Sequence, residues 1–477
     1  MAKRKPASKP AARAVAQKAA KQAARTSRRE QAQSSLKRWL KERRITEVEC
    51  LVPDITGNAR GKIVPETKYS HDFGTRLPEG IFVTTVTGDF PDNYDELVSP
   101  SDSDMYLRPD PDTVRIVPWA KDPTAQIIHD CYTRDGRPHE LAPRNVLRRV
   151  LALYEELGIA PIVAPEVEFF LVQKNTDPDF PLQPPAGRSG RPETARQSYS
   201  IDAVNEFDPI LDDMYDFAEA MELDVDTLIH ESGAAQLEVN FQHADPLSRA
   251  DQVFLFKRSM REAAMRHGVY ATFLALPMSN EPGSAMHIHQ SLVDTNGNNL
   301  FAGDEPGSQS ELFRHYLGGL QKYVPMAMPF FAPNINSYRR LVIGEVSPVN
   351  TEWGYDNRTC GLRVPMDTAE NTRVESRFAG SDVNPYLAIA ATLACGYLGI
   401  KEKLLPTEPL AGDAHHKGFQ LPRSLEESLE NLRHCPELID LLGQRFVAAY
   451  VAVKQKEYET YFRVISSWER EFLLLNV

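Results

Sequence analysis

Acidic residues and histidines recur in this sequence at a spacing of two. Glu166 and Glu168 lie in the apolar run 165–172, and His287 and His289 lie in a second apolar run. Side chains two residues apart in a β-strand point to the same side, about 6.5–7 Å apart. Two carboxylates sharing a site raise each other's pKa unless a cation neutralises them. The spacing therefore favours a divalent metal, although the first run alone fits an edge strand with two solvated glutamates equally well.

Three further acids lie beside apolar, strand-like residues. Glu231 and Glu238 belong to the segment 230–241, and Glu375 lies between two arginines. Five carboxylates and one imidazole suit Mg²⁺ or Mn²⁺ better than zinc, which usually takes cysteine or more histidine. Any single one of them could be a surface charge. The predicted ligands are Glu166, Glu168, Glu231, Glu238, His287 and Glu375.

Six arginines fall within 39 residues in the same part of the chain: Arg339, Arg340, Arg358, Arg363, Arg373 and Arg377. Guanidinium groups match the geometry of phosphate and carboxylate, so an arginine cluster beside a divalent metal suits phosphoryl transfer. One or two of these arginines could instead pair with structural acids. The sequence contains no Gly-x-x-x-x-Gly-Lys-Ser/Thr loop, so metals and arginines would have to hold the phosphates of ATP.

Length and composition limit the kinds of protein that can carry this site. A chain of 477 residues exceeds the size at which one core stops growing, so we expect at least two domains. A net charge of −12 argues against non-specific nucleic-acid binding. Five cysteines without a C-x-x-C motif fit a reducing, cytoplasmic setting. The apolar stretch 385–400 is too short to cross a membrane and is predicted to be a core helix capped by Asn384.

The chain divides into three parts by composition. Residues 1–34 are rich in Lys, Arg and Ala and are expected to be disordered or loosely helical. They could be a solvated extension, a transit peptide or an arm for an anionic surface. Residues 35–138 are predicted to form a small β-rich domain, and a helix ending at Gly158 opens a larger domain over 139–477. The long segment 175–198 beside the first glutamate pair is typical of a lid or substrate loop.

The order of these motifs resembles the glutamine synthetase family over nearly the whole chain after the tail. The resemblance rests on PEVEFF at 165–170, HE through QLE at 230–238, GSAMHIH at 283–289, NSYRR at 336–340, NR through R at 357–363, RVESR at 373–377 and NPY at 384–386.

The resemblance implies a fold and an assembly. The class would be α+β, with a β-grasp N-terminal domain over 35–138 and a catalytic domain over 139–477 whose antiparallel strands form an open funnel flanked by helices. Two stacked hexameric rings would place active sites between neighbouring subunits. The cofactors implied are ATP with two to three Mg²⁺ or Mn²⁺ ions, and the substrates are L-glutamate and an amine. Neither nucleic acid nor a membrane is an expected partner.

The resemblance also implies roles for individual residues. Glu168, Glu231 and Glu238 would hold the metal near the amino acid, and Glu166, His287 and Glu375 the metal on the nucleotide phosphates. Arg340 and Arg377, with the backbone at Gly283, would bind glutamate. Arg358, Arg363 and Arg373 would bind phosphate, His289 and Ser291 would contact nucleotide, and Arg340 and Arg358 would act in catalysis. The implied reaction forms γ-glutamyl phosphate from glutamate and ATP, and an amine then displaces the phosphate.

One departure from the family pattern concerns the amine. Glutamine synthetases carry a Gly-x-Glu-x-Pro loop whose glutamate helps to bind and deprotonate ammonium, and Val346 stands at that position here. The segment around Trp353 resembles that of γ-glutamylpolyamine and γ-glutamylputrescine synthetases. Val346, Trp353 and Tyr355 could line a pocket for putrescine, another polyamine or a monoamine, with cation–π help from the rings. Trp353 and Tyr355 could equally be packing residues.

Two other functions remain open at this point. A one-residue shift could let Glu345 replace the missing acid, which would make the protein a glutamine synthetase that uses ammonium. A catalytically inactive structural member of the family should have lost metal ligands, and all six predicted ligands are present. We therefore expect an ATP-dependent ligase that joins glutamate to an organic amine.

Overall fold

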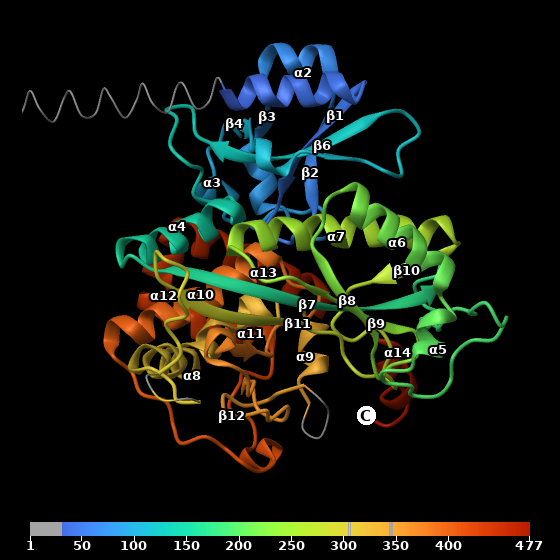
Figure 1. The fold of residues 1–477 in the computed structure, drawn as a ribbon. Coiled ribbons are helices and arrows are strands. Elements are labelled where there is room, and N and C mark those ends of the chain that lie inside the picture. The colour runs from blue at the N-terminus through green and yellow to red at the C-terminus, as the bar shows by residue number, and fades with distance from the viewer. Residues whose placement is uncertain (1–30, 304, 306, 343–346) are drawn as a thin grey trace, which may run out of the picture.

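The computed structural model describes residues 31–303, 305, 307–342 and 347–477. Most of the basic tail therefore lies outside the described residues; its last four residues belong to a helical stretch that is described from 31 to 42. Two β-sheets organise the rest, a six-stranded sheet from the first part of the chain and an eight-stranded sheet from the remainder. Figure 1 shows the first sheet at the top and the second below it, with α4, α6 and α7 between them.

The first sheet has the strand order β2-β1-β6-β4-β3, with β5 paired to β6. β1 runs parallel to β6 and antiparallel to β2. Its strands are β1 (Glu47–Pro53), β2 (Ala59–Pro65), β3 (Thr75–Pro78), β4 (Asp104–Pro109), β5 (Arg115–Ile116) and β6 (Thr124–Tyr132). Short helical segments join them: α2 (Glu66–Asp72), η1 (Glu79–Val83), α3 (Tyr94–Leu97) and η2 (Pro111–Thr113).

The second sheet has the order β12-β13-β14-β11-β7-β9-β8, with β10 paired to β7. Every pairing is antiparallel except the one between β12 and β13, which confirms the mainly antiparallel α+β class. The strands are β7 (Ala160–Gln173), β8 (Val225–His230), β9 (Gln236–Phe241), β10 (Val269–Thr272), β11 (Met286–Val293), β12 (Trp353–Tyr355), β13 (Leu362–Val364) and β14 (Val374–Ser376).

Helices flank this funnel-like sheet, and α4 contacts both β6 of the first sheet and β7 of the second. The helices are α4 (Pro143–Glu156), α5 (Ile201–Asn205), α6 (Asp208–Ala220), α7 (Pro246–Arg266), α8 (Glu311–Phe331), α9 (Ser337–Arg340), α10 (Pro385–Glu402), α11 (Leu425–Arg433), α12 (Pro436–Leu442), α13 (Gln444–Phe462) and α14 (Ser467–Phe472), with short turns η3 (Ala369–Asn371) and η4 (Ala414–Lys417).

Local sequence signals explain where the central elements begin and end. Asn384 accepts hydrogen bonds from the backbone N–H groups of Tyr386 and Leu387, and Pro385 occupies the first turn, so α10 starts where predicted. The body of α10 is buried, which confirms the expected core helix. Gly158, in the left-handed region with φ of +73°, follows the end of α4 and turns the chain into β7. α4, which packs against both α10 and β7, thereby supports the strand that carries the first glutamate pair.

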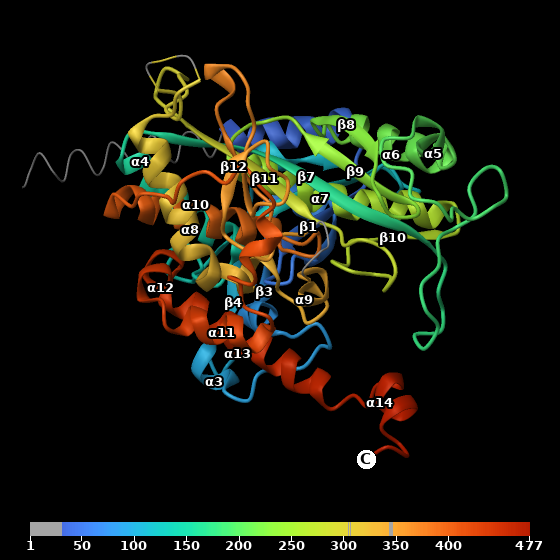
Figure 2. The same cartoon turned by 90° about the horizontal axis from the view of Figure 1, so that it is seen from below.

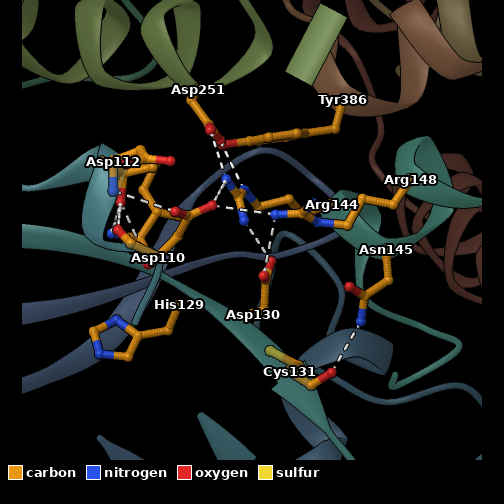
Figure 3. Close-up of polar contacts among 12 residues, drawn as sticks. Asp110, Asp112, His129, Asp130, Cys131, Arg144, Asn145, Arg148, Asp251 and Tyr386 are labelled. Atoms are coloured by element: carbon orange, nitrogen blue, oxygen red, sulfur yellow. Dashed lines mark hydrogen bonds and ion pairs between the residues drawn. The ribbon is translucent and has the colours of Figure 1, made fainter. Parts of the chain in front are cut away.

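A buried ion cluster locks the first sheet to the helices beneath it (Figure 3). Arg144 of α4 donates to both carboxylate oxygens of Asp251 on α7, at 2.9 and 2.7 Å. The same guanidinium contacts Asp130 of β6 and lies 2.7 Å from Asp110, which follows β4. The hydroxyl of Tyr386 on α10 donates to Asp251 at 2.7 Å. The cluster therefore joins α4, α7 and α10 to β6 and to the end of β4.

All five cysteines are free and buried. In the described part of the chain, no helix combines the length and the apolar character needed to cross a bilayer.

Candidate active site

Strand register places the predicted ligands on one face of the second sheet. Glu166 of β7 lies opposite His287 of β11 and Asn240 of β9, and Glu168 lies opposite Glu238. His289 lies opposite Glu375 of β14. Because alternate residues of a strand share a face, the spacing of two carries each pair onto the same side. Because these strands are neighbours in the sheet, the pairs form one continuous polar surface, called the acidic floor below. It consists of Glu166, Glu168, Glu238, His287, His289 and Glu375.

Three overlapping groups on this floor could each hold a metal ion. Within each group, the potential ligand atoms lie within 4.8 Å of one another. One group is Glu168, Glu231 and Glu238, as the sequence predicted for the metal near the amino acid. The second predicted set is divided differently: His287 groups with Glu166 and Glu238, whereas Glu166 and Glu375 group with His289. His289, expected to contact nucleotide, has its Nε2 3.0 Å from Glu166 Oε1 and is also a potential ligand.

The charges on this floor fit divalent cations. Desolvation raises the pKa of Glu168, Glu231 and Glu238, and neighbouring carboxylates raise it further. Desolvation, with the charge of Arg377, lowers the pKa of His287 to about 4, so this imidazole is neutral, as a metal ligand must be. Mg²⁺ and Mn²⁺ prefer hard oxygen donors, which these carboxylates supply. A divalent cation would also relieve the repulsion between the buried carboxylates.

Two arginines bracket Glu375 at the edge of the floor. Arg363 Nη1 lies 2.8 Å from Glu375 Oε2, and Arg377 Nη1 contacts Glu375 Oε1. Although desolvation opposes ionisation, Arg377 and the two imidazoles of β11 lower the pKa of Glu375 to about 2. The buried Nε atoms of both arginines have no hydrogen-bond partner in the described residues. These guanidinium groups therefore keep donors for an anion beyond Glu375.

Arg340 lies beside Arg377 and packs against Gly283. Its Nη1 donates to the carbonyl of Phe378 at 2.9 Å and its Nη2 to that of Arg377 at 3.1 Å. Desolvation, with the charge of Arg377, lowers its pKa to about 10. A Cβ at Gly283 would come within 2.6 Å of Arg340 Cγ, so only glycine leaves room for this side chain. Both residues line a small cavity together with Glu168, Glu231, His287 and Arg377.

A larger cavity of about 610 Å³ opens on the opposite side of the floor. Its lining includes Glu166, His289, Ser291 and Arg373, so three residues expected to contact nucleotide meet here beside a potential metal ligand. Arg373 Nε donates to His289 Nδ1 at 3.2 Å, and its Nη1 pairs with Asp367 at 2.8 Å. The floor therefore has a cavity with a cationic wall on each side.

Three predicted residues are not brought into this arrangement. Arg358 is exposed in the turn after β12 and lines neither cavity. Trp353 pairs in register with Leu362, whereas Gly354 pairs with Arg363, so Trp353 lies on the face away from Glu375. Its indole N–H donates to the carbonyl of Thr407 at 2.7 Å, which favours the packing role. Val346, with Gly344 and Glu345, lies outside the described residues.

Sequence reasoning missed other polar residues of the floor. Gln236 and Asn240 share the parity of Glu238 on β9, and Gln236 Nε2 lies 3.3 Å from Glu168 Oε2. Alternation along β9 could have found both. Glu193, which contacts His230 at 3.0 Å, sits in a loop without periodicity, where the sequence offered no such signal.

The floor can bring two anions together against their mutual repulsion. Metal ions held by the carboxylates would neutralise phosphate oxygens in the larger cavity and a carboxylate in the smaller one. Arg340 and Arg377 present fixed donors on the carboxylate side. This geometry suits transfer of a phosphoryl group to a carboxylate.

Comparison with known proteins agrees with this arrangement. Residues 140–473 match the family model described as glutamine synthetase, catalytic domain. The chain is 33% identical to γ-glutamylputrescine synthetase PuuA of Escherichia coli K12, over 92% of this chain and 94% of that protein. It is 33% identical to glutamate–isopropylamine ligase of a Pseudomonas species, over 77% and 80%. A solved structure titled GmaS/ADP complex superposes with a TM-score of 0.80 at 28% identity, covering 92% of this chain and 99% of the other. The chain belongs to the glutamine synthetase family.

Proposed function

We propose that this protein is an ATP-dependent ligase that joins the γ-carboxylate of L-glutamate to an organic amine through γ-glutamyl phosphate. The observation that carries the proposal is the shared acidic floor between two cavities with cationic walls. A phosphate donor and a carboxylate acceptor placed in these cavities would meet over the same metal ligands. Electrostatic preorganisation of this kind is usually the largest contribution to such a reaction.

The side chains of this protein would divide the work as follows. Arg340 and Arg377 bind the α-carboxylate of glutamate and fix its orientation beside Gly283. His289, Ser291 and Arg373 bind the nucleotide in the larger cavity, and Arg363 stabilises its phosphates. Two to three Mg²⁺ or Mn²⁺ ions held by the floor would supply charge neutralisation between the attacking γ-carboxylate and the γ-phosphate. The amine then attacks the acyl carbon and phosphate leaves.

An organic amine is favoured over ammonium for two reasons. Val346 stands where the family uses a glutamate to bind ammonium. Two of the similar proteins are named for ligation of glutamate to amines, putrescine in one and isopropylamine in the other. Putrescine, another polyamine and a monoamine all fit this class. The competing proposal is a glutamine synthetase, for which Glu345 would replace the missing acid.

Phosphate release from ATP tests the proposal directly. The purified protein is incubated with glutamate and Mg²⁺ or Mn²⁺, and ammonium is compared with putrescine, spermidine and simple monoamines. Turnover with an amine well above turnover with ammonium supports the amine ligase. A preference for ammonium would instead favour glutamine synthetase, and Glu345→Val should then abolish the activity. If no nucleophile supports turnover, the alternative that the protein is a catalytically inactive structural member of the family would be favoured.

We also propose that the active protein is a homo-oligomer, with two stacked hexameric rings as the expected form, in the cytoplasm. The C-terminal segment 462–477 supports this proposal, because α14 stands away from the body of the molecule (Figure 2). Its large apolar side chains are exposed, with Leu475 at 90% and Trp468 at 59%. Exposed apolar surface of this kind marks an interaction site.

The domain division that we propose is 35–138 and 139–477, because each of the two sheets is built from one of these parts of the chain.

A further inference from the structure

The loop between β7 and α5 sends one acidic side chain inward. Every residue from 188 to 199 is exposed except Glu193, whose side chain is only 8% exposed. A carboxylate is rarely buried without partners that compensate its charge. The contacts of Glu193 therefore indicate what this loop does.

Glu193 accepts three hydrogen bonds. His230 Nε2 lies 3.0 Å from Glu193 Oε2, and the backbone N–H of Ala235 donates to the same oxygen at 2.7 Å. The amide of Gln197 donates to Oε1 at 2.9 Å. The other ring nitrogen of His230, Nδ1, lies 2.7 Å from the carbonyl oxygen of Glu231. His230 therefore joins the Glu193 carboxylate to the backbone at Glu231.

The contacts of Glu193 with His230 and Ala235 span the turn that joins β8 to β9. His230 ends β8, and Ala235 immediately precedes β9. Ala235 has φ of +58°, a left-handed conformation that alanine adopts only when its surroundings impose it. The turn carries Glu231 at its start and leads into Gln236, whose amide reaches Glu168 at 3.3 Å. One carboxylate thus holds both ends of the segment that presents a predicted metal ligand.

Neighbouring residues of the loop reinforce the same contact. The backbone N–H of Tyr199 donates to the carbonyl of His230 at 2.8 Å. The hydroxyls of Ser198 and Ser232 lie 2.9 Å apart. The loop therefore lies over the turn along residues 193–199, and Glu193 is its buried anchor.

We propose that Glu193 is a positioning residue that holds the 231–235 turn so that Glu231 points at the metal site formed with Glu168 and Glu238. The inference rests on the proposed function only in taking that group as a metal site. Glu193 makes no contact with the group Glu166, His289 and Glu375, whose members lie on β7, β11 and β14. Loss of Glu193 should therefore weaken one class of metal site and spare another.

Titration of the metal-free full-length protein with Mn²⁺, followed by electron paramagnetic resonance of the free ion, measures this directly. In Glu193→Gln, the class of sites that includes Glu231 is expected to weaken by roughly tenfold or more, the size found for partners that orient metal ligands. The remaining class keeps its affinity. Glu193→Asp, which keeps the charge on a shorter side chain, is expected to give an intermediate loss.

Glu206 provides a matched control for the loss of one carboxylate in the same region. It accepts a hydrogen bond from the backbone N–H of Ser189 at 3.0 Å and holds the loop without contacting the 231–235 turn. Glu206→Gln should leave both classes of Mn²⁺ sites unchanged. Equal weakening of all sites in Glu193→Gln, unchanged sites, or a protein that does not fold would each overturn the proposal.

Kinetics provide a second readout. Because the affected group lies beside Gly283 and Arg340, Glu193→Gln should raise the KM for glutamate, leave the KM for ATP unchanged and recover activity at high Mn²⁺. A loss of kcat that Mn²⁺ does not restore would contradict positioning of a metal ligand. Selective loss of one Mn²⁺ class in a protein that turns over no amine would uphold the role of Glu193 and refute the proposed function.

Discussion

Glu166 and His287 face one another across the β7–β11 pairing, with His287 Nδ1 3.4 Å from Glu166 Oε2. Both side chains project from a hydrogen-bonded ladder rather than from loops. Their separation is therefore fixed by strand register, and a metal ion would find its ligands already close together.

Replacement of Glu238 by glutamine should not destabilise the metal-free protein, but it should reduce the stabilisation that metal ions give. It belongs to two of the three ligand groups, and desolvation with neighbouring carboxylates raises its pKa. Glu238→Gln removes repulsion, so the metal-free variant should melt at the same temperature as the unmodified protein or higher. The rise in Tm caused by Mg²⁺ or Mn²⁺ should shrink strongly, because ligand binding stabilises by mass action. A full metal-induced rise in the variant, measured by thermal denaturation, would contradict the assignment.

Arg340→Lys should raise the KM for glutamate by about tenfold or more, because lysine lacks the planar fork that matches a carboxylate. The KM for ATP should change little, since Arg340 lines the smaller cavity and not the larger one. Arg339→Lys is the matched control: Arg339 is exposed and donates to the hydroxyl of Tyr461 at 2.8 Å. Equal effects of the two substitutions in steady-state kinetics would refute a specific role for Arg340.

Arg144→Met should destabilise the fold by about 3–5 kcal/mol, because it leaves the buried carboxylate of Asp251 without its counter-charge. Arg144 is 3% exposed and contacts Asp110, Asp130 and Asp251. Arg148, 42% exposed, pairs with the same Asp110 and Asp130, and Arg148→Met should cost less than about 1 kcal/mol. Urea denaturation of both variants compares the two costs. Similar losses of unfolding free energy in the two variants would mean that burial of the arginine does not determine the cost of removing it.

His129 should make the first sheet sensitive to acid. Its Nδ1 lies 2.9 Å from the carbonyl of Ile127 and its Nε2 3.3 Å from the hydroxyl of Tyr69. Desolvation lowers its pKa from 6.5 to about 4. The unfolded chain therefore takes up a proton near pH 6.5 while the folded chain does so only near pH 4, and stability falls as the pH decreases through this window.

The loss attributable to His129 amounts to about 3 kcal/mol at most, at 1.36 kcal/mol per pKa unit. His129→Gln should flatten the pH dependence of the unfolding free energy between pH 6.5 and 4, measured by urea denaturation. An unchanged slope would mean that other groups govern the acid response.

Removal of residues 463–477 should dissociate the proposed assembly while leaving the fold intact. The segment exposes apolar side chains, with Leu474 at 73% and Val464 at 62%, and stands apart from the core. Light scattering after size-exclusion chromatography measures the mass of the full-length and shortened proteins, and circular dichroism checks the fold. A shortened protein with the same number of subunits would show that this segment does not hold the assembly together.

The sequence by itself determined the features that depend on residues a few positions apart. The spacing of Glu166 and Glu168, and of His287 and His289, sets which side chains share a strand face, because the period of a strand is a local property. The capping of α10 by Asn384 is local for the same reason. Acids beside apolar, strand-like residues also marked Glu231, Glu238 and Glu375 as candidate ligands, and the resemblance then divided the six ligands between two metal ions.

Only the tertiary structure decided which strands adjoin and how distant segments meet. The register of β12 on β13 turns Trp353 away from Glu375, and the pairing of β11 with β7 brings His289 to Glu166. Glu193 reaches His230 across 37 positions from a loop without periodicity. Such contacts depend on which strands adjoin and on packing between segments far apart in the chain, and the pattern within one segment does not identify its distant neighbours.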